Sequence, residues 1–364
     1  MKVLFHLGHP AHFHLFKNVI KSLNQNNHKT YVLIKKKDVL EDLLIQSKID
    51  FINILPKGRK DSKIFIMLGL IFQTLKLYFF CFKVFPKLLI GTSASIPIIS
   101  KFFPSDSINV NEDDAEAIPL YSKLSYPFSD VILAPKVCSV GKWEHKKINI
   151  QSYHELSYLH PNNFTPSMKV ANKYIDSSTK YFILRFAKLG AHHDTGRKGI
   201  SDDIALQIVK TLEPYGKVYI TSERYINENL EPYRIKINPI DMHHIMAFAS
   251  LYIGDSQTMA AESGVLGVPF IRFNDFVGEL SYLEELENKY QLGYGIKTKN
   301  LEELFEKIEF LLNLSDKENI FKERQKRMLK DKIDYSAFLV WFIENYPDSL
   351  KKMKKNPDIQ YKFR

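Results

Sequence analysis

Along most of the chain, short apolar runs typical of strands alternate with segments whose apolar residues recur at helical spacing. Short apolar runs predict strands at residues 2–7, 29–35, 50–54, 88–90, 107–110 and 131–134, and later at 181–185, 217–221, 251–254 and 270–273. Apolar residues at helical spacing predict helices at 13–24, 39–47, 64–85 and 95–103, and later at 202–212, 240–249, 258–266 and 301–312. Strands that alternate with helices indicate parallel sheets covered on both faces. We therefore predict an α/β protein of two domains, each with a parallel sheet, and a cleft between them.

The alternation is interrupted once, at residues 151–175, where Pro161, Asn162, Asn163 and Pro166 favour a linker. A chain of 364 residues also suggests about two domains. We place an N-terminal domain at 1–165 and a C-terminal domain at 166–335. In the remaining segment, 336–364, a helix at 338–345 is expected to pack back on the first domain, and the basic tail 351–364 is expected to fray.

Composition narrows the class of protein. Hydrophobic residues make up 45% and charged residues 25% of the chain, which excludes wholesale disorder and a polytopic membrane protein. Two cysteines and a first apolar run too short for a signal peptide favour the cytoplasm. The net charge of +10 favours anionic partners such as nucleotides or lipid headgroups. Because basic residues are spread among acidic ones without a compact motif, we expect no nucleic-acid partner.

The longest apolar segment, residues 64–85, is rich in aromatic residues but contains Gln73, Lys76 and Lys83. These polar residues make a membrane-spanning helix a poor interpretation. Two interpretations remain. The segment is an amphipathic helix lying in a membrane interface, which would place the protein at the inner face of the cytoplasmic membrane, or a surface helix that packs on the sheet.

The segment 252–269 carries the most specific chemistry. A buried strand ends at Gly254, and Asp255 or Ser256 can cap the helix that follows. The free amides at the start of this helix can bind phosphate without a lysine; they belong to Gln257, Thr258, Met259 and Ala260. Glu262 lies one turn further on, where a carboxylate can accept hydrogen bonds from ribose hydroxyls. The alternative is a tightly packed strand–helix unit whose small residues serve packing only.

A basic loop follows the strand at 181–185. Its candidate ligands for a diphosphate are Arg185, Lys188, His192, His193, Arg197 and Lys198. Guanidinium groups suit phosphate oxygens, and cations can neutralise a departing diphosphate without a metal. The alternative is a solvated basic loop. Two adjacent histidines without a third ligand do not indicate a metal site, so we expect none.

The first domain offers acid–base groups after two of its strands. His9 and His12 follow the first strand, where a histidine can act as general base on an acceptor hydroxyl; the alternative is that His12 only caps or packs on the first helix. Glu112 and Asp113, with Asp114, follow the strand 107–110. They can orient an acceptor or act as acid and base, or they form a charged, solvated turn.

Five segments carry a resemblance to known proteins: GHPAHFHLFKN at 8–18, NEDD at 111–114, YHELSYLHP at 153–161, LRFAKLGAHHDTGRKG at 184–199 and GDSQTMAAESGVLGVP at 254–269. The last is similar to the nucleotide-binding segment of GT-B-type proteins, which include glycosyltransferases and the UDP-N-acetylglucosamine 2-epimerase superfamily. Over nearly its whole length the chain resembles the bacterial family called domain of unknown function 354.

The resemblance implies two Rossmann-like domains of GT-B type, of which the C-terminal one holds a nucleotide-sugar. Phosphates would sit at 257–260, Glu262 would hold the ribose, and the base would lie near 240–244, which includes His244. In the first domain the loop with Gly8 and His9 would contact substrate, and His12 would be the base.

The activity implied is an inverting, metal-independent glycosyltransferase with no cofactor besides its donor. It would transfer sugar from a UDP-sugar to a surface-polysaccharide or lipid-linked glycan acceptor, with a peripheral membrane contact through 64–85. A nucleotide-sugar 2-epimerase is the alternative, although Gly91-Thr92-Ser93 lacks the aspartate that the epimerases carry at that strand end.

Overall fold

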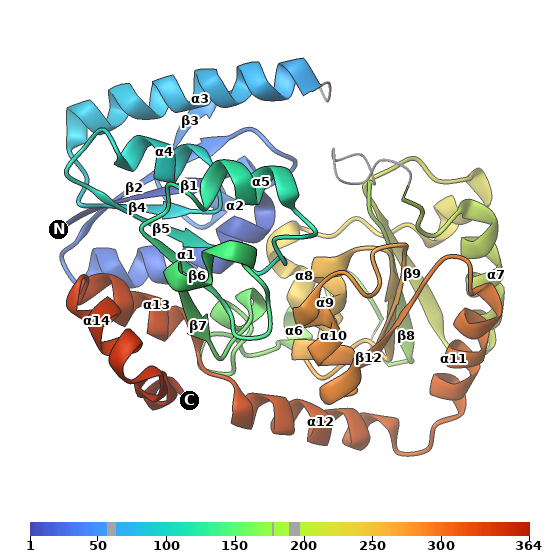
Figure 1. Cartoon of the computed structure of the whole chain (residues 1–364). Helices are drawn as coiled ribbons and strands as arrows, with labels where there is room; N and C mark the ends of the chain where they lie inside the picture. The colour runs from blue at the N-terminus through green and yellow to red at the C-terminus, as the bar shows by residue number, and fades with distance from the viewer. Residues whose placement is uncertain (57–62, 177, 189–196) are drawn as a thin grey trace. The chain divides into compact units, whose positions relative to one another are not determined.

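The computed structural model describes residues 1–56, 63–176, 178–188 and 197–364. Within 63–176, side chains are described from residue 68 onward. The chain divides into two compact units (Figure 1). Unit 1 comprises Met1–Asn163 and Lys332–Arg364, and unit 2 comprises Phe164–Asp331.

Unit 1 is built on a parallel sheet. Within the described residues it has seven strands in the order β3-β2-β1-β4-β5-β6-β7. The strands are β1 (Lys2–Leu7), β2 (Lys29–Lys35), β3 (Ile52–Leu55), β4 (Leu88–Gly91), β5 (Asp106–Val110), β6 (Val131–Pro135) and β7 (Lys147–Ile150). The helices are α1 (Pro10–Gln25), α2 (Leu40–Gln46), α3 (Lys63–Val84), α4 (Ser95–Ser100), α5 (Pro119–Ser125), α13 (Tyr335–Glu344) and α14 (Asp348–Lys355).

Helices cover both faces of this sheet, as the continuous apolar strands require. On one face α1 packs on β1, where the Phe5 and Phe16 rings lie 5.2 Å apart, and α13 packs on α1. On the other face, Leu77 of α3 and Ile96 of α4 share a core cluster with Leu89 of β4. Figure 1 shows α3 and α4 above the sheet and α1 below it.

Unit 2 is a second parallel sheet, with five strands among the described residues in the order β12-β11-β10-β8-β9. The strands are β8 (Tyr181–Phe186), β9 (Lys217–Ser222), β10 (Leu251–Gly254), β11 (Phe270–Phe273) and β12 (Gly293–Ile296). The helices are α6 (Met168–Ala171), α7 (Asp202–Leu212), α8 (Met242–Met246), α9 (Gln257–Val265), α10 (Ser281–Glu284), α11 (Leu301–Asn313) and α12 (Lys317–Asp331). The prediction of an α/β protein with parallel sheets and flanking helices is confirmed.

The prediction of a frayed C-terminal tail is wrong. α14 is followed by a 3-10 helix at Pro357–Phe363. Gln360 in this helix is 2% exposed and bonds the strand end at β7. Its Oε1 accepts from the Gln151 amide at 2.8 Å and its Nε2 donates to the Asn149 carbonyl at 3.3 Å. A buried side-chain amide with both groups paired fixes the tail on unit 1, whatever the charge of the flanking lysines.

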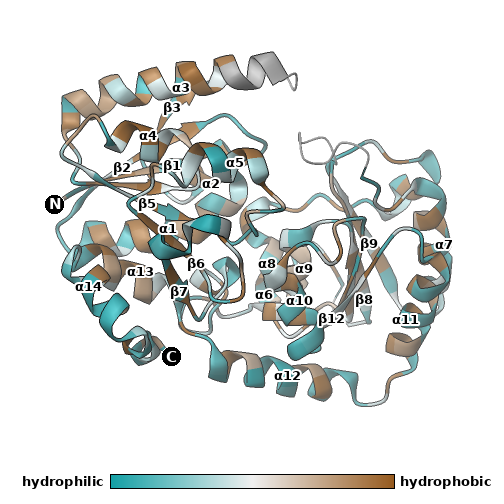
Figure 2. Cartoon of the chain, in the orientation of Figure 1, coloured by the Kyte–Doolittle hydropathy of each residue, from teal (hydrophilic) through white to brown (hydrophobic). Residues whose placement is uncertain are grey.

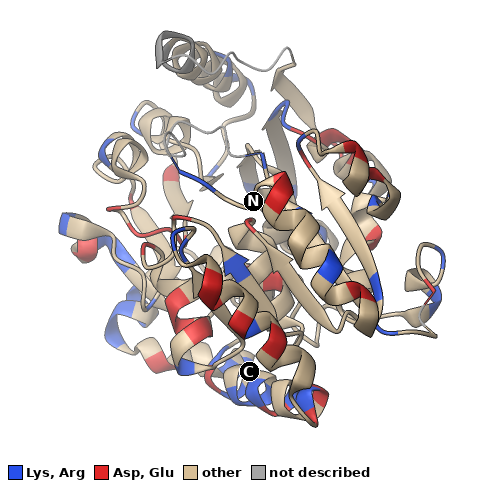
Figure 3. Ribbon diagram, turned by 90° about the vertical axis from the view of Figure 1, so that its right-hand side faces the viewer, with Lys and Arg blue, Asp and Glu red and all other residues tan. Residues whose placement is uncertain are grey.

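Of the helices that the structure describes, none is long and apolar enough to cross a membrane. Charges of both signs are interspersed over the helices in the view of Figure 3.

Candidate functional site

The carboxyl ends of parallel strands collect side chains at one edge of a sheet, and ligands bind where neighbouring strand connections diverge. In unit 1 this point lies between β1 and β4, because β1 pairs with β2 on one side and with β4 on the other. A β-carbon on Gly91, which ends β4, would lie 2.6 Å from the backbone oxygen of His6. Glycine thus lets the ends of β1 and β4 approach closely.

His12, in the first turn of α1, is held at this edge by two partners. The Gly8 amide donates to its Nδ1 at 3.1 Å, and Thr92 Oγ1 lies 2.8 Å from its Nε2. Burial holds the pKa of His12 well below its ordinary value, and the neighbouring His9 adds to this effect. A neutral ring that accepts at Nδ1 carries its proton on Nε2. In this arrangement His12 is a neutral hydrogen-bond donor toward Thr92.

A second histidine at the edge was not singled out from the sequence. His154 opens a 3-10 helix, His154–Ser157, and its Nδ1 lies 3.1 Å from Glu112 Oε1 after β5. The His154 backbone amide donates to the other oxygen of the same carboxylate at 2.9 Å. Glu112 therefore orients the ring, and the proton on Nδ1 leaves the lone pair on Nε2.

The environment of His154 keeps this lone pair available. Its Nε2 is buried and has no hydrogen-bond partner among the residues that the structure describes. Burial lowers the pKa of His154 to about 4, although the Asp113 carboxylate opposes the shift. The ring stacks on Tyr335 with centroids 6.0 Å apart. An unsatisfied buried acceptor costs about 1–3 kcal/mol, which is expected where a group serves chemistry and not stability.

The other candidates in unit 1 take different places. His9 is exposed at the N-cap of α1, where its side chain accepts from the Ala11 amide at 3.2 Å. Asp113 is partly exposed, whereas Asp114 is buried and accepts from the Ser139 amide at 2.6 Å. Asp114 thus holds the backbone at Ser139, Glu112 contacts His154, and Asp113 remains partly exposed.

In unit 2 the strand connections diverge between β8 and β10, because β8 pairs with β9 on one side and with β10 on the other. α9 begins directly after β10. Of the two predicted caps it uses Ser256, whose side chain accepts from the Met259 amide at 3.4 Å. Gln257 and Thr258 occupy the first turn, where amides have no acceptor within the helix and carry the positive end of its dipole.

Asp255 has a different role from capping. Its carboxylate accepts from the Ala187 amide at 2.6 Å and from the Ile200 amide at 3.3 Å, which fixes both ends of the loop that follows β8. Burial raises the pKa of Asp255 to about 6. A β-carbon on Gly199 would lie 2.5 Å from Asp255 Oδ2, so this position needs glycine.

Arg185, near the carboxyl end of β8, lies beside Gly254 in the strand register. Its Nη2 pairs with Glu223, and the Lys188 amide donates to the same carboxylate at 3.1 Å. Arg185 Nε is buried without a hydrogen-bond partner among the described residues. The guanidinium therefore sits at the predicted edge, with part of its charge balanced by Glu223.

Glu262 of α9 and His243 of α8 form a buried pair that the sequence did not suggest. Their side chains are 6% and 5% exposed, and His243 Nε2 lies 2.9 Å from Glu262 Oε1. His244 accepts from the Ser167 amide at 3.1 Å, and its ring lies 4.8 Å from that of Phe164. The structure thus brings together α8 and α9, the two segments predicted to hold base and ribose.

Other predicted ligands lie further along the loop. Arg197 donates to the Asp275 carbonyl at 3.1 Å and pairs with Glu279 at 2.5 Å. His192 and His193 lie outside the described residues. Across the ranges that are described, no three His, Cys, Asp or Glu side chains are grouped to hold a metal ion.

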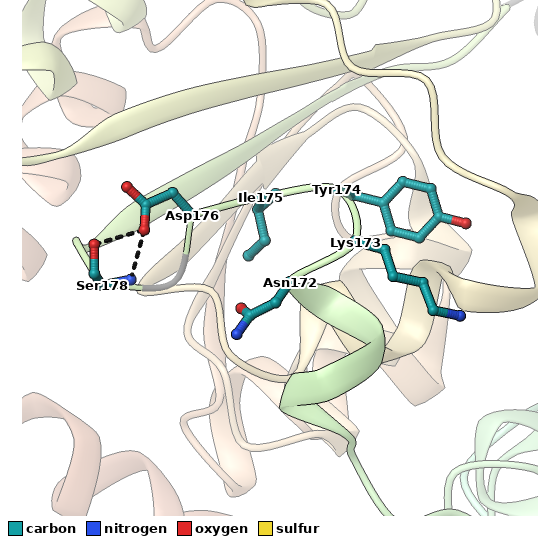
Figure 4. Close-up of a pocket in the computed structure, with 6 residues that line it drawn as sticks. All are labelled: Asn172, Lys173, Tyr174, Ile175, Asp176 and Ser178. Atoms are coloured by element: carbon teal, nitrogen blue, oxygen red, sulfur yellow. Dashed lines mark hydrogen bonds between the residues drawn. The ribbon is translucent and has the colours of Figure 1, made fainter.

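An open hollow of about 600 Å³ in unit 2 lies at the opposite edge of the sheet. It is lined by Asn172, Lys173, Tyr174, Ile175, Asp176 and Ser178, which precede β8 (Figure 4). Asp176 turns toward Ser178, accepting from its amide at 3.0 Å, and pairs with Lys217 at the start of β9 at 2.9 Å. Because it lies at the amino edge, we do not assign the site to this hollow.

Comparison with known proteins supports the fold. No family model matches the sequence, and no curated protein matches it. A putative UDP-N-acetylglucosamine 2-epimerase from Listeria monocytogenes is 12% identical with a TM-score of 0.66, covering 98% of this chain and 97% of its own. MnaA from S. aureus, solved with UDP, is 14% identical with a TM-score of 0.68 over 96% and 97% of the two chains.

The spinosyn rhamnosyltransferase SpnG, complexed with spinosyn aglycone, is 12% identical with a TM-score of 0.62 over 95% of this chain and 100% of its own. Such identities show the fold alone. Membership of the domain of unknown function 354 family stays a prediction. The chain has a GT-B-like fold of two Rossmann-type domains, as do these epimerases and glycosyltransferases.

Proposed function

We propose that the protein is a GT-B-type glycosyltransferase that moves a sugar from a UDP-sugar to a surface-polysaccharide or lipid-linked glycan acceptor. The observation that carries the proposal is a division of chemistry between two sheet edges. Unit 1 presents the Glu112–His154 pair and His12, which are acid–base groups. Unit 2 presents Arg185 and the Ser256-capped start of α9, which suit a diphosphate.

The donor is assigned to unit 2. The amides of Gln257 and Thr258 and the Arg185 guanidinium hold the two phosphates. Glu262, oriented by His243, accepts from the ribose hydroxyls. His244 is assigned to the nucleobase of the donor. A carboxylate has about four acceptor sites, so a bond to His243 and a bond to a ribose hydroxyl are compatible.

The proposed transfer step assigns one role to each of these groups. The acceptor oxygen forms a bond to the anomeric carbon while the bond from that carbon to the diphosphate oxygen breaks. The acceptor proton passes to His154 Nε2, and the Glu112 carboxylate stabilises the imidazolium that forms. The electron pair of the broken bond leaves with UDP, whose added charge is met by Arg185 and the α9 amides. One displacement of this kind inverts the anomeric centre and uses no metal.

His12 and Asp113 are the alternative bases in unit 1. His12 carries its proton on Nε2 in the free protein, because its Nδ1 accepts from Gly8. In that state its Nε2 donates to Thr92 Oγ1, and the ring has no free lone pair to accept the proton of the acceptor. A role for His12 as base would require the ring to give up the Gly8 bond.

The second candidate function is nucleotide-sugar 2-epimerisation. It is favoured by the carboxylates after β5 and by the likeness in fold to epimerases such as MnaA. It is opposed by Gly91-Thr92-Ser93, which supplies no carboxylate at the end of β4. Epimerisation needs no acceptor and no membrane.

The test is to incubate the protein with UDP-sugars in the presence and absence of lipid-linked glycan and to measure UDP and sugar products. The proposal predicts UDP release that requires the acceptor. An epimer formed from the UDP-sugar alone would establish the alternative, and no consumption of any UDP-sugar would overturn both. His154→Asn is expected to lower kcat about 10²–10⁴-fold, whereas His145→Asn, at an exposed histidine of the same unit, is expected to leave it unchanged.

A lipid-linked acceptor has to be reached at a membrane surface. We propose that residues 64–85 make this peripheral contact.

A further inference from the structure

α3 presents an apolar face that no described side chain covers. Leu68, Ile71, Phe72, Leu75, Phe79 and Phe82 are each between 50% and 68% exposed. Their spacing of three, four and seven residues places them on one side of a helix. Figure 2 shows hydrophobic colour along most of α3, in contrast to the mixed colours of α11 and α12. Exposed apolar residues scattered singly are ordinary, but a continuous stripe marks an interaction surface.

The opposite side of α3 fixes the helix to unit 1. Leu77 and Cys81 are fully buried, and Gln73 is 6% exposed. Gln73 Nε2 donates to Ser93 Oγ and to Ser95 Oγ, both at 3.0 Å. The helix is thus held by its inner face, and the outer stripe is presented without any rearrangement.

The stripe continues into aromatic residues at the C-terminal end of α3. Phe85 and Phe102 are 55% and 67% exposed. The rings of Phe82 and Phe85 lie 5.7 Å apart, and the ring of Phe102 lies 6.1 Å from that of Tyr78. We call the stripe together with Phe85 and Phe102 the α3 surface.

The charges around the α3 surface select its partner. Lys83 and Lys87 are exposed beside the aromatic end, and Lys76 Nζ lies 4.7 Å from the centre of the Phe72 ring. The charge of Lys101, by contrast, is balanced by an ion pair with Asp130. In the sequence from 57 to 105 the only acidic residue is Asp61.

We infer that the α3 surface lies in the interface of an anionic lipid membrane, with its aromatic rings below the headgroups and Lys83 and Lys87 among them. Large rings beside lysines with long alkyl stems suit this boundary. A symmetric contact with a second copy would use the same surface on both sides, and the sequence around α3 that would face the lysines of the other copy has a single acidic residue, Asp61. The inference deepens the proposed membrane contact by naming the side chains that enter the membrane and the anionic lipid they meet, and it rests on the proposed function for its purpose.

The test is flotation of the purified protein with vesicles of phosphatidylcholine, with and without phosphatidylglycerol. Wild-type protein is expected to bind the anionic vesicles more tightly, and salt is expected to weaken the binding. Phe79→Ser with Phe82→Ser removes two rings without changing charge and is expected to weaken binding about tenfold or more. Lys83→Gln with Lys87→Gln is expected to cost about fivefold per lysine, on the anionic vesicles only.

Phe310→Ser, at a 49% exposed phenylalanine of α11, is the matched control and is expected to bind like wild type. Unchanged binding of the Phe79/Phe82 variant would overturn the inference. A second outcome would also overturn the inference: wild-type protein is a dimer, the Phe79/Phe82 variant is a monomer, and neither binds vesicles. That outcome would assign the α3 surface to a contact with a second copy. UDP binding of the same variants, measured by calorimetry, separates the two proposals, since it tests unit 2 and involves no lipid.

Discussion

Replacing Glu262 by glutamine tests whether the buried pair of α8 and α9 belongs to a nucleotide site. The change keeps the shape of the side chain and removes its charge. In the structure Glu262 Oε1 lies 2.9 Å from His243 Nε2, and both side chains are at most 6% exposed. If the carboxylate also accepts from a ribose hydroxyl, the substitution weakens a charge-assisted hydrogen bond in a buried setting.

The magnitude follows from that bond. Hydrogen bonds to charged groups contribute about 1.5–3 kcal/mol, which corresponds to about 10–100-fold in affinity. Calorimetry with UDP should therefore give a Kd about 10–100-fold higher for Glu262→Gln than for wild type. Wild-type protein should also bind UDP more tightly than the deoxy analogue (2′-deoxy or 3′-deoxy) that lacks the hydroxyl bonded by Glu262. The Glu262→Gln variant should lose most of this preference.

The comparison between UDP and deoxy-UDP is the control for general damage. A variant that is merely less stable would weaken both ligands equally, whereas a lost ribose contact weakens UDP selectively. Equal UDP affinity in a folded Glu262→Gln protein would refute the assignment of Glu262 to the ribose. The pair with His243 would then be explained by packing alone.

Two further predictions concern other buried groups. His6 is 1% exposed, and burial, with Lys35, lowers its pKa to about 3, so the unfolded chain binds its proton below about pH 6.5 while the folded chain does not. The free energy of unfolding therefore decreases as the pH is lowered below about 6.5, by about 2 kcal/mol between pH 7 and pH 5. Denaturant unfolding should show that the His6→Leu protein lacks this decrease, and an identical pH dependence of the two proteins would contradict the prediction. Arg185→Gln should weaken UDP binding about tenfold or more in calorimetry, whereas Glu223→Gln, which frees the guanidinium, should not weaken it; equal losses in both variants would assign Arg185 a structural role.

The sequence predicted the layered architecture because apolar runs and helical spacing are local signals. It missed β12, Gly293–Ile296, because two glycines in four residues give little strand signal. It assigned the tail to a frayed segment because charge dominates α14, although Met353 is 2% exposed and Gln360 bonds the sheet. Burial of a few positions in a charged helix becomes visible only once its neighbours are known.

The candidate site was predicted only where local patterns in the sequence could locate it. The segments after the strands were located from their pattern, and Arg185 and Ser256 lie where the pattern placed them. His154 was missed because it falls in the stretch interpreted as a linker and because its partner, Glu112, is 42 residues away. The available signal was the segment YHELSYLHP at 153–161, which carries part of the resemblance and contains His154. The link from Asp255 to the loop after β8 likewise depends on strand pairing and not on any local spacing.

The most direct measurement is a thermal-shift panel of the whole protein with UDP, GDP, CDP, ADP and dTDP. A ligand at about 100 times its Kd stabilises the folded protein by about 2.7 kcal/mol, which a melting curve resolves. We expect a shift with UDP that the other four nucleotides do not match. No shift with any nucleotide at millimolar concentration would contradict a nucleotide-sugar site in unit 2 and, with it, the assignment of glycosyl transfer to this protein.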